Sequence, residues 1–196
     1  FRRPDVAGAF ENAVKIARGV GMECVGYIIV GAPEQDPKNS LEDLLYLFRH
    51  RVLCGVSVYY PSPGSFDFQG CRERDILPGH VSLMRSSAIP MDGKTERRDS
   101  ITLLRLGRVL NFIKLLRDQA IDLPGPWPFS SISFPPEEKL MWGKALLGHF
   151  LYDGLIRWVT PEGKVFEHET TPFLCLSLRE KLVGEKLVPA GNSPIV

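Results

Sequence analysis

Two short apolar segments in the first third of the chain each end in a turn rich in glycine and proline. The first segment, 23–30, reads Glu-Cys-Val-Gly-Tyr-Ile-Ile-Val and is followed by the turn 31–34, Gly-Ala-Pro-Glu. The second, 53–60, is followed by the turn 61–64, Pro-Ser-Pro-Gly. Apolar runs of this length, bounded by turn residues, predict two β-strands.

The segment between these two strands has the pattern of a helix. Leucine and phenylalanine recur at helical spacing from Leu41 to about His50. Ser40 is the expected N-cap, and Glu42 and Asp43 are expected in the first turn, where the helix dipole favours acidic groups. The three elements together predict a strand–helix–strand unit with parallel strands.

The first strand predicts how this sheet is covered. Successive residues of 25–30 are apolar, which is typical of a parallel strand with helices on both faces. Ligands of open and barrel-like α/β sheets bind at the carboxyl ends of parallel strands. The turns 31–34 and 61–64 are therefore the predicted site.

The regions around this unit follow a coarser pattern. Pro4 and Asp5 open a helix that runs to about Ala17, and the segment 61–98 is expected to be mostly loop. Asp99 or Ser100 is expected to cap a long helix that ends near residue 118. A chain that opens on an amphipathic helix and a buried strand lacks a partner for them, so we expect it to be a piece of a longer protein.

A second, smaller unit is expected after a proline-rich linker. A helix over 137–152, a hairpin of strands 154–159 and 164–168, and a last short helix opened by Pro172 are predicted, followed by a disordered tail over 189–196. The predicted domains are therefore 1–122 and 123–196. The fold class is α/β with a small α+β extension.

Composition narrows the possible partners. The 196 residues are 44% hydrophobic and 24% charged, and the net charge is +1. This balance gives no strong signal for nucleic acid or for an acidic membrane. The sequence shows no signal peptide, and its longest apolar run is too short to span a bilayer. The four cysteines are scattered without a C-x-x-C pair, so we expect reduced thiols in a cytoplasmic protein and no metal site within this chain.

The two turns have features that suit a flat ligand. Gly31 allows close approach to the backbone, and Ile29 offers an apolar side chain next to backbone hydrogen-bonding groups. Pro61 fixes a rigid corner after Tyr59 and Tyr60. An adenine ring needs this combination of an apolar face with backbone donors and acceptors at its edge. The first turn is neither G-x-G-x-x-G nor a phosphate-binding loop.

Structural roles compete with functional ones at most of these positions. One of Tyr59 and Tyr60 is expected in the core, because neighbouring residues of a strand face opposite sides. Glu34 suits a turn or a helix start, and His50 suits a helix end. The other histidines have no metal partner at helical or strand spacing. A basic stripe on the long helix could bind a phosphate or an acidic substrate, or could be a solvated face; its residues are Arg97, Arg98, Arg105, Arg108 and Lys114.

The segment 27–34, Tyr-Ile-Ile-Val-Gly-Ala-Pro-Glu, resembles the fifth-strand motif of radical SAM enzymes, G-x-I-x-G-x-x-E, and 58–65 resembles their sixth strand with its P-x-P-G-S turn. Ile29, Gly31 and Glu34 match the motif, whereas Tyr27 replaces its first glycine. The resemblance covers about residues 1–71. It implies the C-terminal half of a (β/α) barrel of the TIM type, with Ile29 and the nearby backbone on the adenine of S-adenosylmethionine and Gly31 and Glu34 shaping that end of the pocket.

The same resemblance implies a 4Fe-4S cluster that this chain cannot hold alone. Three thiolates in a C-x-x-x-C-x-x-C segment bind such a cluster, and no segment here has that spacing. We therefore expect a fragment that is inactive by itself and whose substrate is unknown. Two alternatives remain: a non-catalytic module that binds a partner or acts as a scaffold, and a half-barrel from an unrelated (β/α) enzyme.

Overall fold

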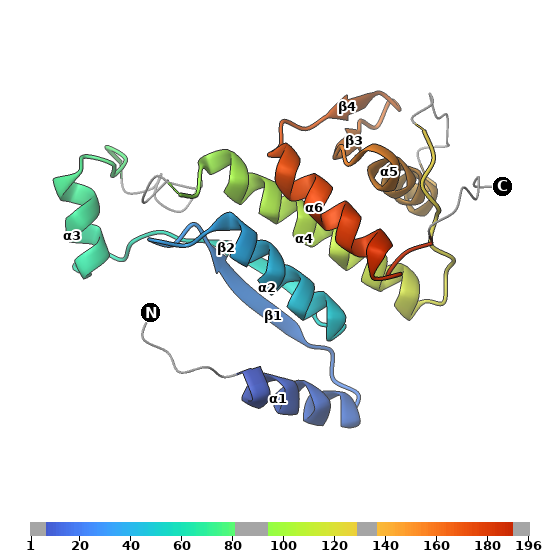
Figure 1. The fold of residues 1–196 in the computed structure, drawn as a ribbon, viewed down its shortest axis with the longest axis horizontal. Coiled ribbons are helices and arrows are strands. Elements are labelled where there is room, and N and C mark those ends of the chain that lie inside the picture. The colour runs from blue at the N-terminus through green and yellow to red at the C-terminus, as the bar shows by residue number, and fades with distance from the viewer. Residues whose placement is uncertain (1–6, 81–93, 129–136, 190–196) are drawn as a thin grey trace.

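The computed structural model describes residues 7–80, 94–128 and 137–189 and shows a mixed α/β fold (Figure 1). Its elements, in chain order, are α1 (Ala7–Gly19), β1 (Val25–Val30), α2 (Pro37–Arg49), β2 (Leu53–Val58), α3 (Phe66–Glu73), α4 (Arg97–Asp118), α5 (Lys139–Asp153), β3 (Arg157–Val159), β4 (Val165–Glu167) and α6 (Pro172–Gly184).

The strand–helix–strand unit is present as predicted. β1 and β2 pair in parallel, with Val25 opposite Leu53 and Val30 opposite Val58, and α2 connects them. In the described residues these two strands form a sheet of their own, and no closed barrel is present.

One face of this sheet is covered by α2 and α4. Two glycines permit the close packing: a side chain at Gly26 would collide with Leu47 of α2, and a Cβ at Gly107 of α4 would lie 3.0 Å from Val56 Cγ2. The core continues through α6, which packs on α2 and α4. Its fully buried side chains include Leu44, Leu45, Leu103, Leu106, Leu110, Ile113, Leu116, Leu174 and Leu178.

The other face of the sheet does not have the cover that the sequence pattern predicted. Val25, Tyr27 and Ile29 are 51%, 75% and 42% exposed. These residues alternate along β1 with Gly26 and Val30, which are buried. The prediction of helices on both faces is wrong for the described residues, because α2 and α4 lie on the same side of the strands.

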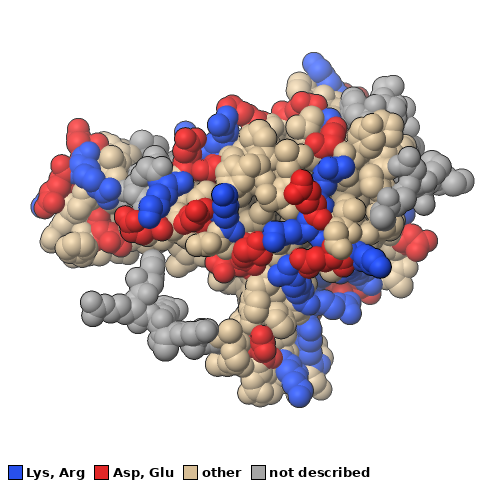
Figure 2. Space-filling model, in the orientation of Figure 1, with Lys and Arg blue, Asp and Glu red and all other residues tan. Residues whose placement is uncertain are grey.

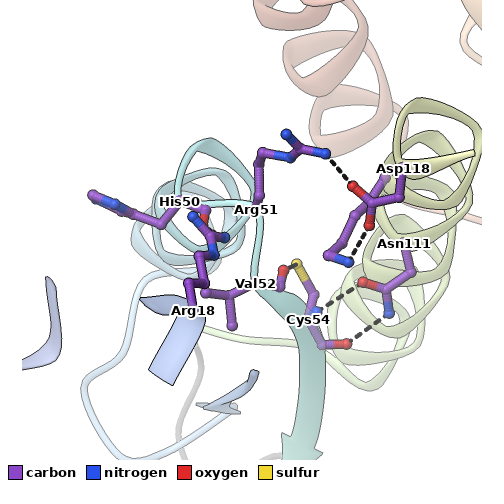
Figure 3. A network of polar contacts seen from close by, with 8 residues as sticks. Arg18, His50, Arg51, Val52, Cys54, Asn111 and Asp118 are labelled. Carbon is purple, nitrogen blue, oxygen red and sulfur yellow. Dashed lines mark hydrogen bonds and ion pairs between the residues drawn. The ribbon is translucent and has the colours of Figure 1, made fainter. Parts of the chain in front are cut away.

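The side chain of Asn111 in α4 bonds the outer edge of β2 at Cys54 (Figure 3). The Asn111 amide accepts from the Cys54 N–H at 2.7 Å and donates to the Cys54 carbonyl at 3.0 Å. At the end of α4, Asp118 forms ion pairs with Arg51 and Lys114. These two cations lower the pKa of Asp118, the hydrogen bond from Lys114 being the larger cause.

The start of α2 differs from the prediction. Asp36 is the N-cap and accepts from the Lys38 N–H at 2.8 Å, and Pro37 is the first helical residue. Ser40 is therefore inside the helix and buried. Glu42 and Asp43 lie beyond the first turn, so they do not face the positive end of the helix dipole.

The segment 61–98 also holds more structure than predicted. Ser65 caps α3 and accepts from the Phe68 N–H at 3.1 Å. The N-cap of α4 is Glu96, and Asp99, which was predicted to be a cap, is the third helical residue; its carboxylate accepts from the Glu96 N–H at 2.9 Å. Residues 81–93 of this segment lie outside the described residues.

The C-terminal helix–hairpin–helix order is confirmed. β3 and β4 pair antiparallel, and α5 ends at Gly154, which has a left-handed φ of 77°. Both strands are shorter than predicted. Residues 190–196, where a disordered tail was expected, lie outside the described residues.

The predicted boundary near residue 122 stays a prediction. A single cluster of buried side chains extends from Val14 in α1 to Val188 after α6.

Figure 2 shows acidic and basic side chains interspersed on the viewed face, rather than a field of one sign. Within the described residues, no helix combines the length and the apolar character needed to cross a membrane.

Candidate functional site

The carboxyl ends of β1 and β2 bring the two predicted turns together. The Tyr59 N–H donates to the Val30 carbonyl at 2.8 Å, directly before Gly31 and Pro61 begin their turns. The five candidate residues therefore lie near the carboxyl ends of the two strands, but their side chains have different surroundings. They are Ile29, Gly31, Glu34, Tyr59 and Pro61.

Gly31 has a backbone conformation that favours glycine. Its φ is 76°, in the left-handed region. A Cβ at this position would lie 3.1 Å from Ser100 Oγ and 3.8 Å from Thr95 Cγ2, at the start of α4. The turn and its packing on α4 thus account for glycine here without a ligand.

Ile29 is the apolar candidate whose side chain is open to a ligand. It is half-exposed on the bare face of the sheet. Its carbonyl accepts from Gln35 Nε2 at 2.8 Å, and Gln35 Oε1 accepts from the Ala32 N–H at 3.1 Å. Gln35 therefore holds the turn closed against the end of β1 and occupies one of the backbone groups predicted to be exposed.

Glu34 is a turn residue, as one interpretation of the sequence expected. Its φ is 64°, and its exposed carboxylate forms an ion pair with Lys94. This pair fastens the first turn to the segment that leads into α4. An exposed ion pair contributes little to stability.

Tyr59 and Pro61 are buried. The Tyr59 ring packs with Cys71 of α3, and its hydroxyl donates to Asp67. Burial, followed by the hydrogen bond to Asp67, raises the pKa of Tyr59. Tyr60 is exposed, which confirms that one of the two tyrosines belongs to the core.

Two residues that sequence reasoning missed hold the site together. Besides the Gln35 side chain, Thr95 Oγ1 donates to the Gln35 carbonyl at 2.6 Å. A polar residue after Pro33-Glu34 is a weak signal for the role of Gln35. No local pattern could reveal Thr95, because it is 60 residues away in the sequence.

The basic stripe of α4 is not continuous. Lys114 is only 12% exposed and faces Asp118 on the sheet side of the helix. Arg98 pairs with Glu169 at 3.6 Å, whereas Arg105 and Arg108 face a cavity on the other side.

The histidines are dispersed. His50 is the C-cap of α2, as its predicted place at a helix end suggested. His149 is buried in α5, stacks on Trp127 and contacts its carbonyl through Nδ1 at 3.2 Å. Burial lowers the pKa of His149.

The cysteines do not form a cluster site. Cys54, Cys71 and Cys175 are buried on β2, α3 and α6, and Cys24 is half-buried before β1. Among the described residues, no three histidine, cysteine or acidic side chains lie close enough to share a metal ion.

Comparison with known proteins adds no relative: no family model, curated protein or solved structure matches this chain.

Proposed function

We propose that this chain is part of a radical SAM enzyme and contributes the adenine side of its S-adenosylmethionine site. The observation that carries the proposal is the bare apolar face of β1 at Val25, Tyr27 and Ile29. Parallel sheets are normally covered on both faces. In a (β/α) barrel the helices cover the outside and the other face lines the interior.

The position of the motif supports this assignment. Ile29 lies on the bare face, at the carboxyl end of β1, where ligands of α/β barrels bind. Because alternate residues of a parallel strand direct their backbone groups to opposite neighbours, the groups of Val25, Tyr27 and Ile29 point away from β2. That edge of β1 has no partner strand in the described residues, so a further strand of a barrel could pair with it at Val25 and Tyr27, whereas the Ile29 carbonyl already accepts from Gln35.

The chain fits one part of the cofactor set and not the other. The Ile29 side chain could pack on an adenine ring, with the backbone of the turn at Gly31 beside it. S-adenosylmethionine would supply radical chemistry on an unknown substrate after reductive cleavage. The four cysteines do not fit a 4Fe-4S cluster, because Cys54, Cys71 and Cys175 lie on separate elements and Cys24 lies before β1. Its ligands would have to come from other residues of the complete protein.

The coding sequence upstream of Phe1 gives the first test. A C-x-x-x-C-x-x-C segment after a predicted strand would support the proposal. Continuous coding sequence that holds four further strands without that segment would favour a half-barrel from an unrelated (β/α) enzyme.

Calorimetry of the complete protein with S-adenosylmethionine gives the second test. Ile29→Asp should weaken binding at least about tenfold, because burying an unpaired carboxylate costs several kcal/mol and about 1.4 kcal/mol is tenfold in affinity. Val25→Asp is the matched control, since it introduces the same charge on the same face about 13 Å away. Gly31→Val is less informative, because the positive φ alone would strain the fold.

The comparison of the two variants decides the outcome. Parent-like binding by Val25→Asp with a loss in Ile29→Asp supports the proposal. Parent-like binding by both variants would place the adenine elsewhere and remove the main support for the family assignment.

A further inference from the structure

A cavity of about 280 Å³ lies on the side of α4 that faces away from the parallel sheet. Gly107 of α4 packs on β2, whereas Arg105, Val109 and Phe112, on the opposite side of the helix, line the cavity. Leu146 of α5 contributes to its apolar lining. The cavity is thus separate from the candidate site at the strand ends.

The charge around this cavity is not balanced. Three arginines line it, and one of them is neutralised: Arg157 binds Asp153 at 2.6 Å and Glu167 at 3.1 Å. Neither Arg105 nor Arg108 has a carboxylate within ion-pair distance among the residues that the structure describes. In the part of the chain that the structure describes, two guanidinium groups therefore line an apolar cavity without an ion-pair partner.

The pKa shifts are consistent with this unbalanced charge. Burial, and then the neighbouring Arg108, lower the pKa of Arg105. Burial, and then both arginines, lower the pKa of His168, which also lines the cavity. An anion placed here would relieve the repulsion between the two guanidinium groups.

One wall of the cavity is aromatic and held in place by stacking. Trp158 of β3 stacks on Phe166 with 4.9 Å between ring centroids and on His168 with 6.1 Å. The wall offers a flat apolar surface beside the guanidinium groups. Pockets for small ligands commonly combine such an apolar surface with a few placed polar groups.

We propose that this cavity binds a small anionic molecule with a flat apolar body, whose acidic group is held by Arg105 and Arg108 and whose body packs between Phe112, Leu146 and Trp158. The site requires neither S-adenosylmethionine nor the bare face of β1. This second proposal is therefore tested independently of the proposed function.

Two fluorescent probes of matched shape test the charge requirement. 8-Anilinonaphthalene-1-sulfonate carries one sulfonate, and N-phenyl-1-naphthylamine has the same rings without it. The parent chain should bind the sulfonate probe more tightly, at one site per chain. The double variant Arg105→Gln/Arg108→Gln should weaken the sulfonate probe at least about tenfold, because charged hydrogen bonds contribute that much or more. Its affinity for the neutral probe should stay within about twofold of the parent.

Three further variants serve as controls. Arg97→Gln removes the same charge from an exposed position of α4 and should leave both affinities unchanged. The double variant Arg105→Lys/Arg108→Lys keeps the charge and should retain most of the sulfonate binding. Leu146→Trp fills the cavity and should weaken both probes. Far-ultraviolet circular dichroism and a cooperative urea transition identify variants that keep the parent fold.

The proposal is overturned by any of three results with folded variants. The first is that Arg97→Gln loses as much affinity for the sulfonate probe as the glutamine double variant does. The second is that the glutamine double variant loses as much affinity for the neutral probe as for the sulfonate probe. The third is that Leu146→Trp binds both probes like the parent. Should the glutamine double variant fail to fold, Leu146→Trp and the lysine double variant decide the question.

Discussion

The side-chain amide of Asn111 makes both of the hydrogen bonds that a neighbouring strand would make to Cys54, one to its N–H and one to its carbonyl. Unpaired strand edges promote association between chains. One residue of α4 thus closes the outer edge of β2 at Cys54 with a side chain. On the opposite edge of the sheet, along β1, the Gln35 side chain donates to the Ile29 carbonyl, and β1 has no partner strand there among the described residues.

Replacing Asn111 by leucine should destabilise the fold. The change leaves the two backbone groups of Cys54 without partners in a partly buried position, which costs about 1–3 kcal/mol. Urea unfolding measures the difference. The matched control is Asn12→Leu at an exposed position of α1, which should change the free energy of unfolding by less than about 0.5 kcal/mol. Equal effects of the two substitutions would contradict the role assigned to Asn111.

Gly148 is the position at which a single methyl group should be most costly. A Cβ there would overlap Nε1 of Trp127, whose indole lies over the glycine. Gly148→Ala should therefore destabilise by about 1–3 kcal/mol and alter tryptophan fluorescence. Gly70→Ala in α3 has no atom within 4 Å of the new Cβ and should be stabilising by about 0.5–1 kcal/mol. A neutral Gly148→Ala variant would contradict the packing of Trp127.

The stability should fall as the pH is lowered from about 7 to 5.5. His149 has a folded-state pKa below its unfolded value of about 6.5, so the unfolded chain binds the extra proton first and is favoured as the pH falls. Above about pH 7.5 the contribution is fully present. The slope attributable to His149 can reach about 1.4 kcal/mol per pH unit. Urea unfolding of His149→Gln should show a correspondingly flatter profile; parallel profiles for the two proteins would argue against a neutral buried imidazole.

The chain should self-associate through its bare face. Val25, Tyr27 and Ile29 present apolar side chains next to an unpaired strand edge. Sedimentation velocity should show concentration-dependent association, and Tyr27→Lys should reduce it. Tyr152→Lys, at an exposed position of α5, is the control and should have no effect. A parent chain that stays monomeric at all concentrations would count against an open half-barrel.

Anaerobic reconstitution with iron and sulfide should give no stoichiometric cluster. The four thiols lie on separate elements, and burial raises the pKa of Cys54 to about 12, which disfavours the thiolate needed as a ligand. Iron and sulfide analysis gives the measurement. An absorption band at about 400 nm with about four irons per chain would refute the expectation.

The sequence predicts the order of the elements except α3, because each of the other apolar runs ends at a turn or a helix stop. It predicts helix starts less well where two good caps compete. Asp36-Pro37 and Ser40 both suit an N-cap, and the burial of Ser40 against the core selects the earlier one. The apolar run of β1 also cannot reveal which face of the strand is covered, because apolar residues occupy both its exposed and its buried positions.

The candidate site was predictable only as far as it is local. Ile29 and Gly31 could be predicted as site residues because Ile29 lies near the end of the strand and Gly31 begins the turn that follows it. The hydrogen bond from Thr95 to the Gln35 carbonyl joins segments far apart in the sequence. The cavity is likewise lined by residues from distant segments, such as Arg105 of α4 and His168 after β4. Such contacts depend on the packing of whole helices, which local sequence patterns do not reveal.

At Gly107, α4 lies between the parallel sheet and the cavity and contacts both. Because Gly107 has no side chain, the helix packs closely on Val56, whose Cγ2 would be 3.0 Å from a Cβ at this position. On the opposite side of the same turn, Arg105 and Val109 line the cavity. A helix is stiff across its width, so a sideways shift of this turn that opens one side must narrow the other. Sheet and cavity are mechanically linked through a single helical turn.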